Sequence, residues 1–258
     1  MTRTMCLAGI LVTVLVTAPA ARQSSSSPPP DWSAVTGQLE HAVLGDDAPG
    51  VRRARTDLLR LLAAGPAPDR AALVQYAIAY AGWRLSTNPA VSGRERDDLL
   101  DDAEERLKTA VKVDPKFAEG YALLSGVYGL KISVSPMSGI LLGPRSGGAI
   151  DRAEQLEPDN PRVLLSRGIG KFNTPAMFGG SIKDAEACLR RAIDRFAVES
   201  PAKPFPAWGR FDAHAWLGQV LAKRGDKAAA RAEYERALEV APKSGWVQFV
   251  LMPALDKR

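Results

Sequence analysis

The clearest hydrophobic pattern lies near the C-terminal end, where two short runs predict a pair of helices. Apolar and small residues recur there at three- and four-residue spacing on either side of a turn at residues 224–226: Leu217, Gly218, Leu221, Ala230, Tyr234 and Ala237. Pro242 follows the second run and stops it. Small residues at three of these positions would let the helices approach closely, with Tyr234 filling the gap between them.

This arrangement resembles the tetratricopeptide repeat (TPR), a helix–turn–helix unit of 34 residues. The resemblance rests on the six residues just given, on Gly225-Asp226 in the turn, and on Pro242 after the second helix. His214 is a departure, because it takes the place where that family often has a tryptophan. The resemblance implies an antiparallel pair of helices that stacks on neighbouring pairs.

The same spacing recurs upstream and predicts the architecture of residues 32–258. Second helices are expected at residues 101–115, 149–158 and 184–196, and first helices at 72–85, 118–130 and 162–172. A leading pair is expected at 32–43 and 51–64, and a capping helix at 245–255. We therefore predict an all-α, TPR-like α-solenoid of about 10–11 helices in antiparallel pairs. Because one pair cannot bury its apolar stripe alone, the pairs must stack, and their curvature leaves a concave groove.

Three turns inside the predicted pairs are longer than the clean C-terminal example, at residues 86–98, 132–147 and 172–180. Equivalent turns lie along one edge of a solenoid, and insertions there often belong to the binding face. The inserted residues include several apolar ones: Met137, Ile140, Leu141, Leu142, Met177 and Phe178. Such side chains either fold back onto the solenoid as plugs or form a rim over the groove that contacts a ligand or protein.

Candidate binding residues come from the groove-facing stripe and from these long turns. They are Tyr121, Gly126, Met137, Leu141, Leu142, Arg145, Phe172, Met177, Phe178, Trp216, Gln219 and Lys223. A clamp for a peptide carboxylate, which some TPR domains build from Lys, Asn and Arg, is not expected, because only Lys223 fits that pattern. The small and weakly polar stripe suits a helix or an apolar ligand better.

The N-terminal residues differ from the rest of the chain and predict export. Residues 1–20 combine Arg3, an apolar run and Ala18-Pro19-Ala20, which predicts a signal peptide cleaved after Ala20, with an uncleaved anchor as the alternative. Residues 21–31 are rich in Ser and Pro and read as a tether. Cleavage would leave Cys188 as the only cysteine, so no intrachain disulfide could form, and we expect Cys188 to act as a small buried hydrophobe.

Charge and composition exclude several classes of function. The 34 Lys and Arg against 29 Asp and Glu give a net charge of +5, but the signs are interleaved as on solvated helix faces, so no nucleic-acid partner is expected. There are two histidines, no Cys/His quartet and no calcium loop, which predicts neither a metal site nor a cofactor. Neither a nucleophile elbow nor a phosphate-binding loop occurs, so we expect no enzymatic activity. After removal of the signal no stable membrane span is expected.

A narrower resemblance covers most of residues 70–255. It is carried by two stretches, from LGPRSG to AMFGG and from DAHAWLGQ to ALEVAP. These stretches are similar to those of a group of exported bacterial TPR proteins without an assigned activity. The resemblance implies a fold and a secreted location. The sequence therefore favours a non-enzymatic scaffold or adaptor of the periplasm or cell envelope that binds a protein or peptide in the groove. The alternative is a small-ligand or lipid-binding accessory protein similar to the TPR-built T component of TRAP transport systems.

Overall fold

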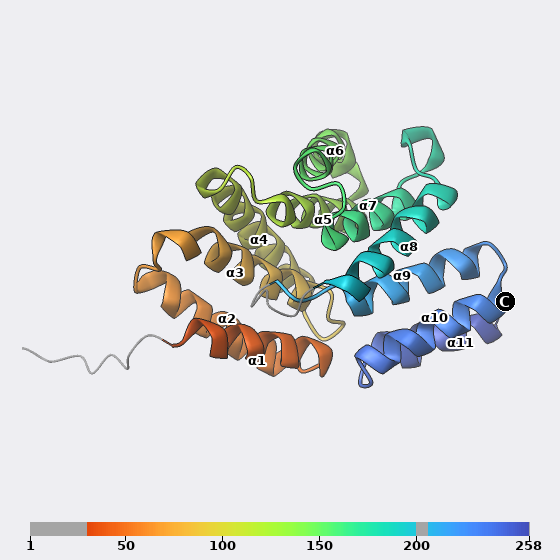
Figure 1. The fold of residues 1–258 in the computed structure, drawn as a ribbon, viewed down its shortest axis with the longest axis horizontal. Helices are drawn as coiled ribbons and strands as arrows, with labels where there is room; N and C mark the ends of the chain where they lie inside the picture. The colour runs from red at the N-terminus through yellow and green to blue at the C-terminus, as the bar shows by residue number, and fades with distance from the viewer. Residues whose placement is uncertain (1–29, 200–205, 258) are drawn as a thin grey trace, which may run out of the picture.

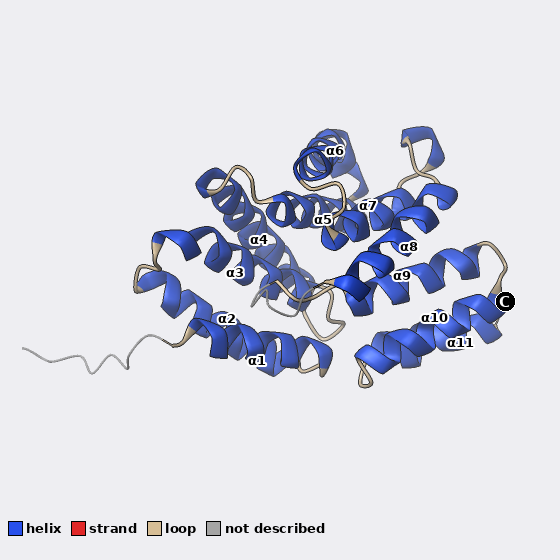
Figure 2. Cartoon of the chain, viewed as in Figure 1, coloured by secondary structure: helices blue, strands red, loops and turns tan. Residues whose placement is uncertain are grey.

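The structure, a computed structural model, describes residues 30–199 and 206–257. The predicted signal peptide and most of the predicted tether lie outside these residues. The described part is all-helical (Figures 1 and 2). Its α-helices are α1 (Trp32–Leu44), α2 (Ala48–Ala63), α3 (Ala71–Ser86), α4 (Gly93–Val113), α5 (Ala118–Val134), α6 (Gly139–Leu156), α7 (Pro161–Asn173), α8 (Ile182–Val198), α9 (Arg210–Lys223), α10 (Lys227–Val240) and α11 (Met252–Asp256).

Consecutive helices pack in pairs, and the pairs stack in chain order, as predicted. The pairs are α1 with α2, α3 with α4, α5 with α6, α7 with α8, and α9 with α10. The first helix of each pair also contacts the next pair, so α5 lies against both α4 and α7, and α9 against both α8 and α7. The predicted all-α solenoid of antiparallel pairs is therefore confirmed (Figure 1). None of the described helices combines the length and the apolar composition that a bilayer crossing requires.

Small residues hold the two helices of a pair together at equivalent positions. A Cβ atom on Gly218 would lie 2.3 Å from the ring of Tyr234 and 3.1 Å from the carbonyl oxygen of Ala230, both on α10. A Cβ on Gly168 would lie 2.8 Å from Leu189 on α8. In α5 the equivalent residue is Ser125, whose hydroxyl lies 2.9 Å from that of Ser146 on α6. In the α5–α6, α7–α8 and α9–α10 pairs the close approach thus depends on one small residue in the first helix.

Two glycines on first helices should respond oppositely to alanine. Gly218→Ala is expected to lower the free energy of unfolding by about 2 kcal/mol, because the new methyl group overlaps the Tyr234 ring. Gly126→Ala is expected to raise it by about 0.5–1 kcal/mol, because a Cβ there meets nothing within 4 Å and alanine favours the helix. Chemical denaturation followed by circular dichroism measures both. A loss of stability in the Gly126 variant would show that α5 needs a bare backbone at that position.

The turn between α5 and α6 is shorter than the sequence predicted, because many of the inserted residues are helical. Helix α5 continues to Val134, a single turn of 3-10 helix spans Pro136–Ser138, and α6 begins at Gly139. Residues 139–147, predicted as part of a turn, therefore form the first half of α6, even with Pro144 inside the helix. The extra residues lengthen both helices of the pair, and each helix satisfies within itself the backbone hydrogen bonds that a long loop would leave open.

The turn between α7 and α8 does remain irregular. Helix α7 ends at Asn173, Ala176–Phe178 forms a 3-10 turn, and α8 begins at Ile182. The predicted C-terminal capping helix is present as one helical stretch over residues 245–256, in which a π-helical turn at Val247–Leu251 runs directly into the short α11. Pro253 stands at the start of α11, where its missing N–H interrupts the regular α-helical pattern.

Candidate functional site

One row of equivalent positions marks the inner face of the solenoid. Tyr76, Glu119, Arg162 and Asp212 each stand six residues before the small residue that meets the partner helix, which is Gly82, Ser125, Gly168 or Gly218. They lie on α3, α5, α7 and α9, the first helices of successive pairs. Their side chains are buried and interact across the face or with the segment that covers it. The row therefore runs along the concave side.

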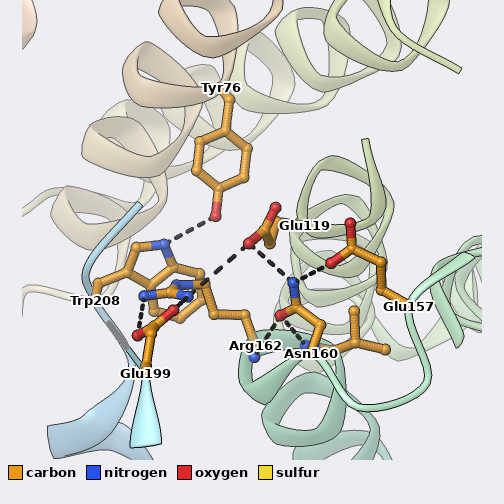
Figure 3. A network of polar contacts seen from close by, with 8 residues as sticks. Tyr76, Glu119, Glu157, Asn160, Arg162, Glu199 and Trp208 are labelled. Carbon is orange, nitrogen blue, oxygen red and sulfur yellow. Dashed lines mark hydrogen bonds and ion pairs between the residues drawn. The ribbon is translucent and has the colours of Figure 1, made fainter. Parts of the chain in front are cut away.

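A short segment before α9 crosses this face, and we call residues 206–209 the strap. The Nε1–H of Trp208 donates a hydrogen bond of 2.9 Å to the hydroxyl of Tyr76 on α3 (Figure 3). The Trp208 ring stacks on Tyr80 with a centroid distance of 5.0 Å and lies 5.8 Å from the ring of Trp83. Gly209 adopts a left-handed backbone (φ +117°), which suits glycine, where the strap enters α9.

Beneath the strap, Arg162 is fully buried within a polar network (Figure 3). Its guanidinium makes two contacts to Glu199, at 2.6 and 3.2 Å, and lies 3.9 Å from Glu119. The guanidinium carbon also lies 5.4 Å from the centre of the Phe196 ring. Asn160 donates to Glu119 at 2.9 Å and caps α7 with its side-chain oxygen. These contacts pair the buried positive charge with carboxylates from two other parts of the chain.

Helices α3 and α9 also meet directly across the concave face. Arg84 makes a two-point ion pair with Asp212, at 2.8 and 3.2 Å, and both side chains are largely buried. The guanidinium lies 5.6 Å from the Tyr80 ring centre and 5.4 Å from that of Trp83. The groove expected along the whole solenoid is therefore filled between α3 and α9 by the strap and this ion pair. The filling follows from residues distant in sequence that meet only after the solenoid curves.

An accessible aromatic surface remains at the C-terminal side of the inner face, and we call Phe172, Trp216 and Trp246 the aromatic row. The rings of Phe172 and Trp216 lie 5.8 Å apart, and those of Trp216 and Trp246 lie 5.6 Å apart. All three side chains are half-buried, so each keeps one accessible side. The Lys223 ammonium lies 5.0 Å from the centre of the Phe172 ring, a cation–π contact at the end of the row.

Gln219 lies on the same helix, between Trp216 and Lys223, and its Nε2 atom is buried without a hydrogen-bond partner in the described part of the chain. An unsatisfied buried amide costs about 1–3 kcal/mol. Four of the candidate binding residues, Phe172, Trp216, Gln219 and Lys223, are therefore placed along one continuous surface. This surface can stack flat or apolar groups and offer one positive charge.

The remaining candidates fall into two other places. Tyr121 is half-buried against a small cluster formed with α6 and α7, and Gly126 lies half-exposed on α5 with open space beside it. Leu142 is buried and packs into the main core. The others are exposed at the tips of the α5–α6 and α7–α8 pairs: Met137, Leu141, Arg145, Met177 and Phe178. Of the apolar residues in the long turns, Leu142 therefore folds back, whereas most of the others do not.

No three His, Cys, Asp or Glu side chains within residues 30–199 and 206–257 are placed to hold a metal ion. His214 is buried and its Nδ1 lies 2.7 Å from Glu233, a structural contact between α9 and α10. Burial raises the pKa of the Cys188 thiol, which disfavours the reactive thiolate.

Sequence reasoning missed the strap, the network around Arg162 and Trp246. One signal could have found Arg162, because it has the same six-residue offset from Gly168 that Asp212 has from Gly218. Trp246 likewise follows Asp212 by one TPR repeat length, about 34 residues. Trp208 lies between repeats, where no periodic pattern applies, so spacing could not have predicted its position.

Comparisons with known proteins agree with this geometry. A family model described as tetratricopeptide repeat matches residues 211–244, while no curated protein matches the sequence. Among solved structures, TTC0263, a thermophilic TPR protein from Thermus thermophilus, is similar with a TM-score of 0.60 and 22% identity, over 87% of this chain and 100% of that chain. The HusA haemophore from Porphyromonas gingivalis is similar with a TM-score of 0.63 and 23% identity, over 77% of this chain and 96% of that chain.

These likenesses concern the fold, and they agree with the packing derived above. The residues matched by the family model, 211–244, are those whose spacing first predicted the repeat. The stacked pairs upstream repeat the same close approach at Gly168 and Ser125. Residues 211–244 thus match the tetratricopeptide-repeat family model, and the described part of the chain has the stacked helix pairs of a TPR-like solenoid.

Proposed function

We propose that this protein is a non-enzymatic scaffold or adaptor of the bacterial periplasm or cell envelope, and that it binds a peptide or protein segment over the aromatic row. TPR folds commonly serve protein interactions. The proposed location rests on the N-terminal sequence, where an apolar run precedes Ala18-Pro19-Ala20. The observation that carries the proposed activity is the accessible row of Phe172, Trp216 and Trp246 beside the unpartnered amide of Gln219.

The chemistry of this surface fits a polypeptide. Aromatic side chains supply large and rigid contact area at a small entropy cost, and they dominate the binding energy of many interfaces. The Gln219 amide lies beside the row with its Nε2 atom buried and unpartnered, so a side-chain rotation on binding would let it donate to a backbone carbonyl of the partner. Lys223, which is exposed, would attract an acidic residue at the adjoining position.

Site-specific photocrosslinking in the native host tests this proposal. A photoreactive phenylalanine at position 223 is expected to form a discrete polypeptide adduct, and adding Trp216→Ala is expected to reduce that adduct about tenfold through loss of a central aromatic contact. The matched control places the same group at Lys112, an exposed position on α4 outside the inner face. Equal adducts from both positions would contradict binding at the aromatic row.

A second candidate is a small-ligand or lipid-binding accessory protein, similar to the T component of TRAP systems. The half-buried indole rings of Trp216 and Trp246 favour it, because such rings can hold a flat apolar molecule as well as a peptide. The solved structure of HusA is that of a haemophore, so a similar helical fold serves a small-molecule function in that protein. Native mass spectrometry of protein purified from its host separates the two: a retained apolar molecule favours this candidate, and a co-purifying polypeptide favours the first.

A further inference from the structure

Two neighbouring helix pairs end in exposed apolar tips. At the α5–α6 tip, Met137 is 80%, Ile140 82% and Leu141 60% exposed. At the α7–α8 tip, Met177 is 83% and Phe178 72% exposed. Several large apolar side chains that remain exposed near one edge of a folded chain indicate a contact surface. We call these five residues the apolar tips.

The apolar tips lie on the same edge of the solenoid. Each follows the C-terminal end of a first helix, α5 or α7, and these two helices pack against each other. In Figure 1, α6 and the turn between α7 and α8 both project from the upper side of the molecule. All five side chains are largely exposed, so they are free to contact an external surface.

The sequence around both tips carries positive charge only. Residues 130–150 and 160–183 contain no Asp or Glu, although the chain has 29 acidic residues in total. Arg145, Lys171 and Lys183 lie near the tips, and none of them forms an ion pair within the described residues. The nearest following carboxylate is Asp184, in the first turn of α8. The charged residues of the segments that form both tips are therefore all basic, and of these Lys131 is paired with Asp101 and Glu104 on α4, whereas Arg145, Lys171 and Lys183 are left to meet an external anion.

We infer that the apolar tips dock the protein onto an anionic lipid bilayer. Apolar side chains that enter the acyl boundary, together with cations that meet anionic headgroups, are the two features of reversible interfacial binding. The exposed apolar residues belong to two separate segments, 137–141 and 177–178, and each can enter a bilayer independently, whereas a folded protein partner usually covers one continuous surface. The inference is independent of the proposed peptide site, because the aromatic row lies on the inner face.

Hydrogen–deuterium exchange of the full chain measures this docking locally. With vesicles of phosphatidylcholine and phosphatidylglycerol in equal parts, we expect slower exchange in residues 134–142 and 173–181. Vesicles of phosphatidylcholine alone should protect these residues much less, and added salt should weaken the effect because it screens the headgroup charge. The local readout separates docking by the tips from any attachment through the N-terminal apolar segment, which all samples share.

Paired variants sharpen the test. Replacing Met137, Ile140, Met177 and Phe178 with serine is expected to abolish the local protection and to weaken vesicle binding about tenfold or more, through loss of buried apolar area. Arg145→Gln with Lys183→Gln should weaken it about fivefold per charge. The matched controls are Val198→Ser, which is 75% exposed at the opposite end of α8, and Arg210→Gln at the start of α9.

Two outcomes would overturn the inference. One is the absence of protection at the tips with anionic vesicles, even where the protein sediments with them. The other is equal loss of binding in the tip variants and in the Val198 and Arg210 controls. Protection of the tips by a purified protein partner, with none by vesicles, would assign the edge to protein binding instead. Circular dichroism of every variant verifies that the helices are retained.

Discussion

Replacing Arg162 with alanine is expected to lower the free energy of unfolding by about 3–5 kcal/mol, which is a large part of the stability of an ordinary domain. The side chain is 0% exposed and its guanidinium faces Glu199 and Glu119. Removing the cation leaves the largely buried Glu119 carboxylate and the partly buried Glu199 carboxylate without their positive partner. It also leaves a cavity against Phe196, whose ring the guanidinium covers. Urea denaturation followed by far-ultraviolet circular dichroism measures the change.

The matched control is Arg195→Ala on α8. Arg195 also pairs with a carboxylate, that of Asp159 at 3.0 Å, but its side chain is 47% exposed. Water replaces the lost partner there, so the expected change is within about 0.5 kcal/mol. If both substitutions cost the same small amount, the carboxylates around Arg162 must be solvated, and the network would not hold the inner face together.

The repeat architecture could be predicted because it depends on local spacing. Gly218, Ala230 and Tyr234 lie within one helix pair, and their separation along the chain determines how that pair packs. The same reasoning placed Phe172, Trp216 and Lys223 near the inner face, and the structure brings these three together. A periodic chain therefore reveals both its elements and the side of each element that faces inward.

Contacts between distant repeats could not be predicted in this way. Trp208 meets Tyr76, 132 residues earlier, and Arg84 meets Asp212, 128 residues later. No pattern within one repeat carries that information, because the contacts arise only from the curvature of the whole stack. At residues 139–147 a local signal was itself misleading. Glycine and proline there predicted a loop, but packing against α5 stabilises a helix.

A substitution in the strap is expected to have the second large effect on stability, because Trp208 covers the inner face. Trp208→Ala is expected to lower the free energy of unfolding by about 3–5 kcal/mol, as is usual when a buried large aromatic side chain is removed. The indole is 7% exposed, stacks on Tyr80 and donates to the Tyr76 hydroxyl. Its loss would uncover the rings on α3 and loosen the connection between α3 and α9.

Two companion substitutions separate the causes of that loss. Trp208→Phe keeps part of the stacked area but removes the hydrogen bond to Tyr76, so we expect about 1–2 kcal/mol. Trp216→Ala removes a half-buried ring from the aromatic row and should also cost about 1–2 kcal/mol, because part of that ring is already in water. The same denaturation measurement compares all three variants. A loss for Trp208→Ala no larger than that for Trp216→Ala would mean that the strap lies on the solenoid without closing it, and that the inner face is open along its whole length.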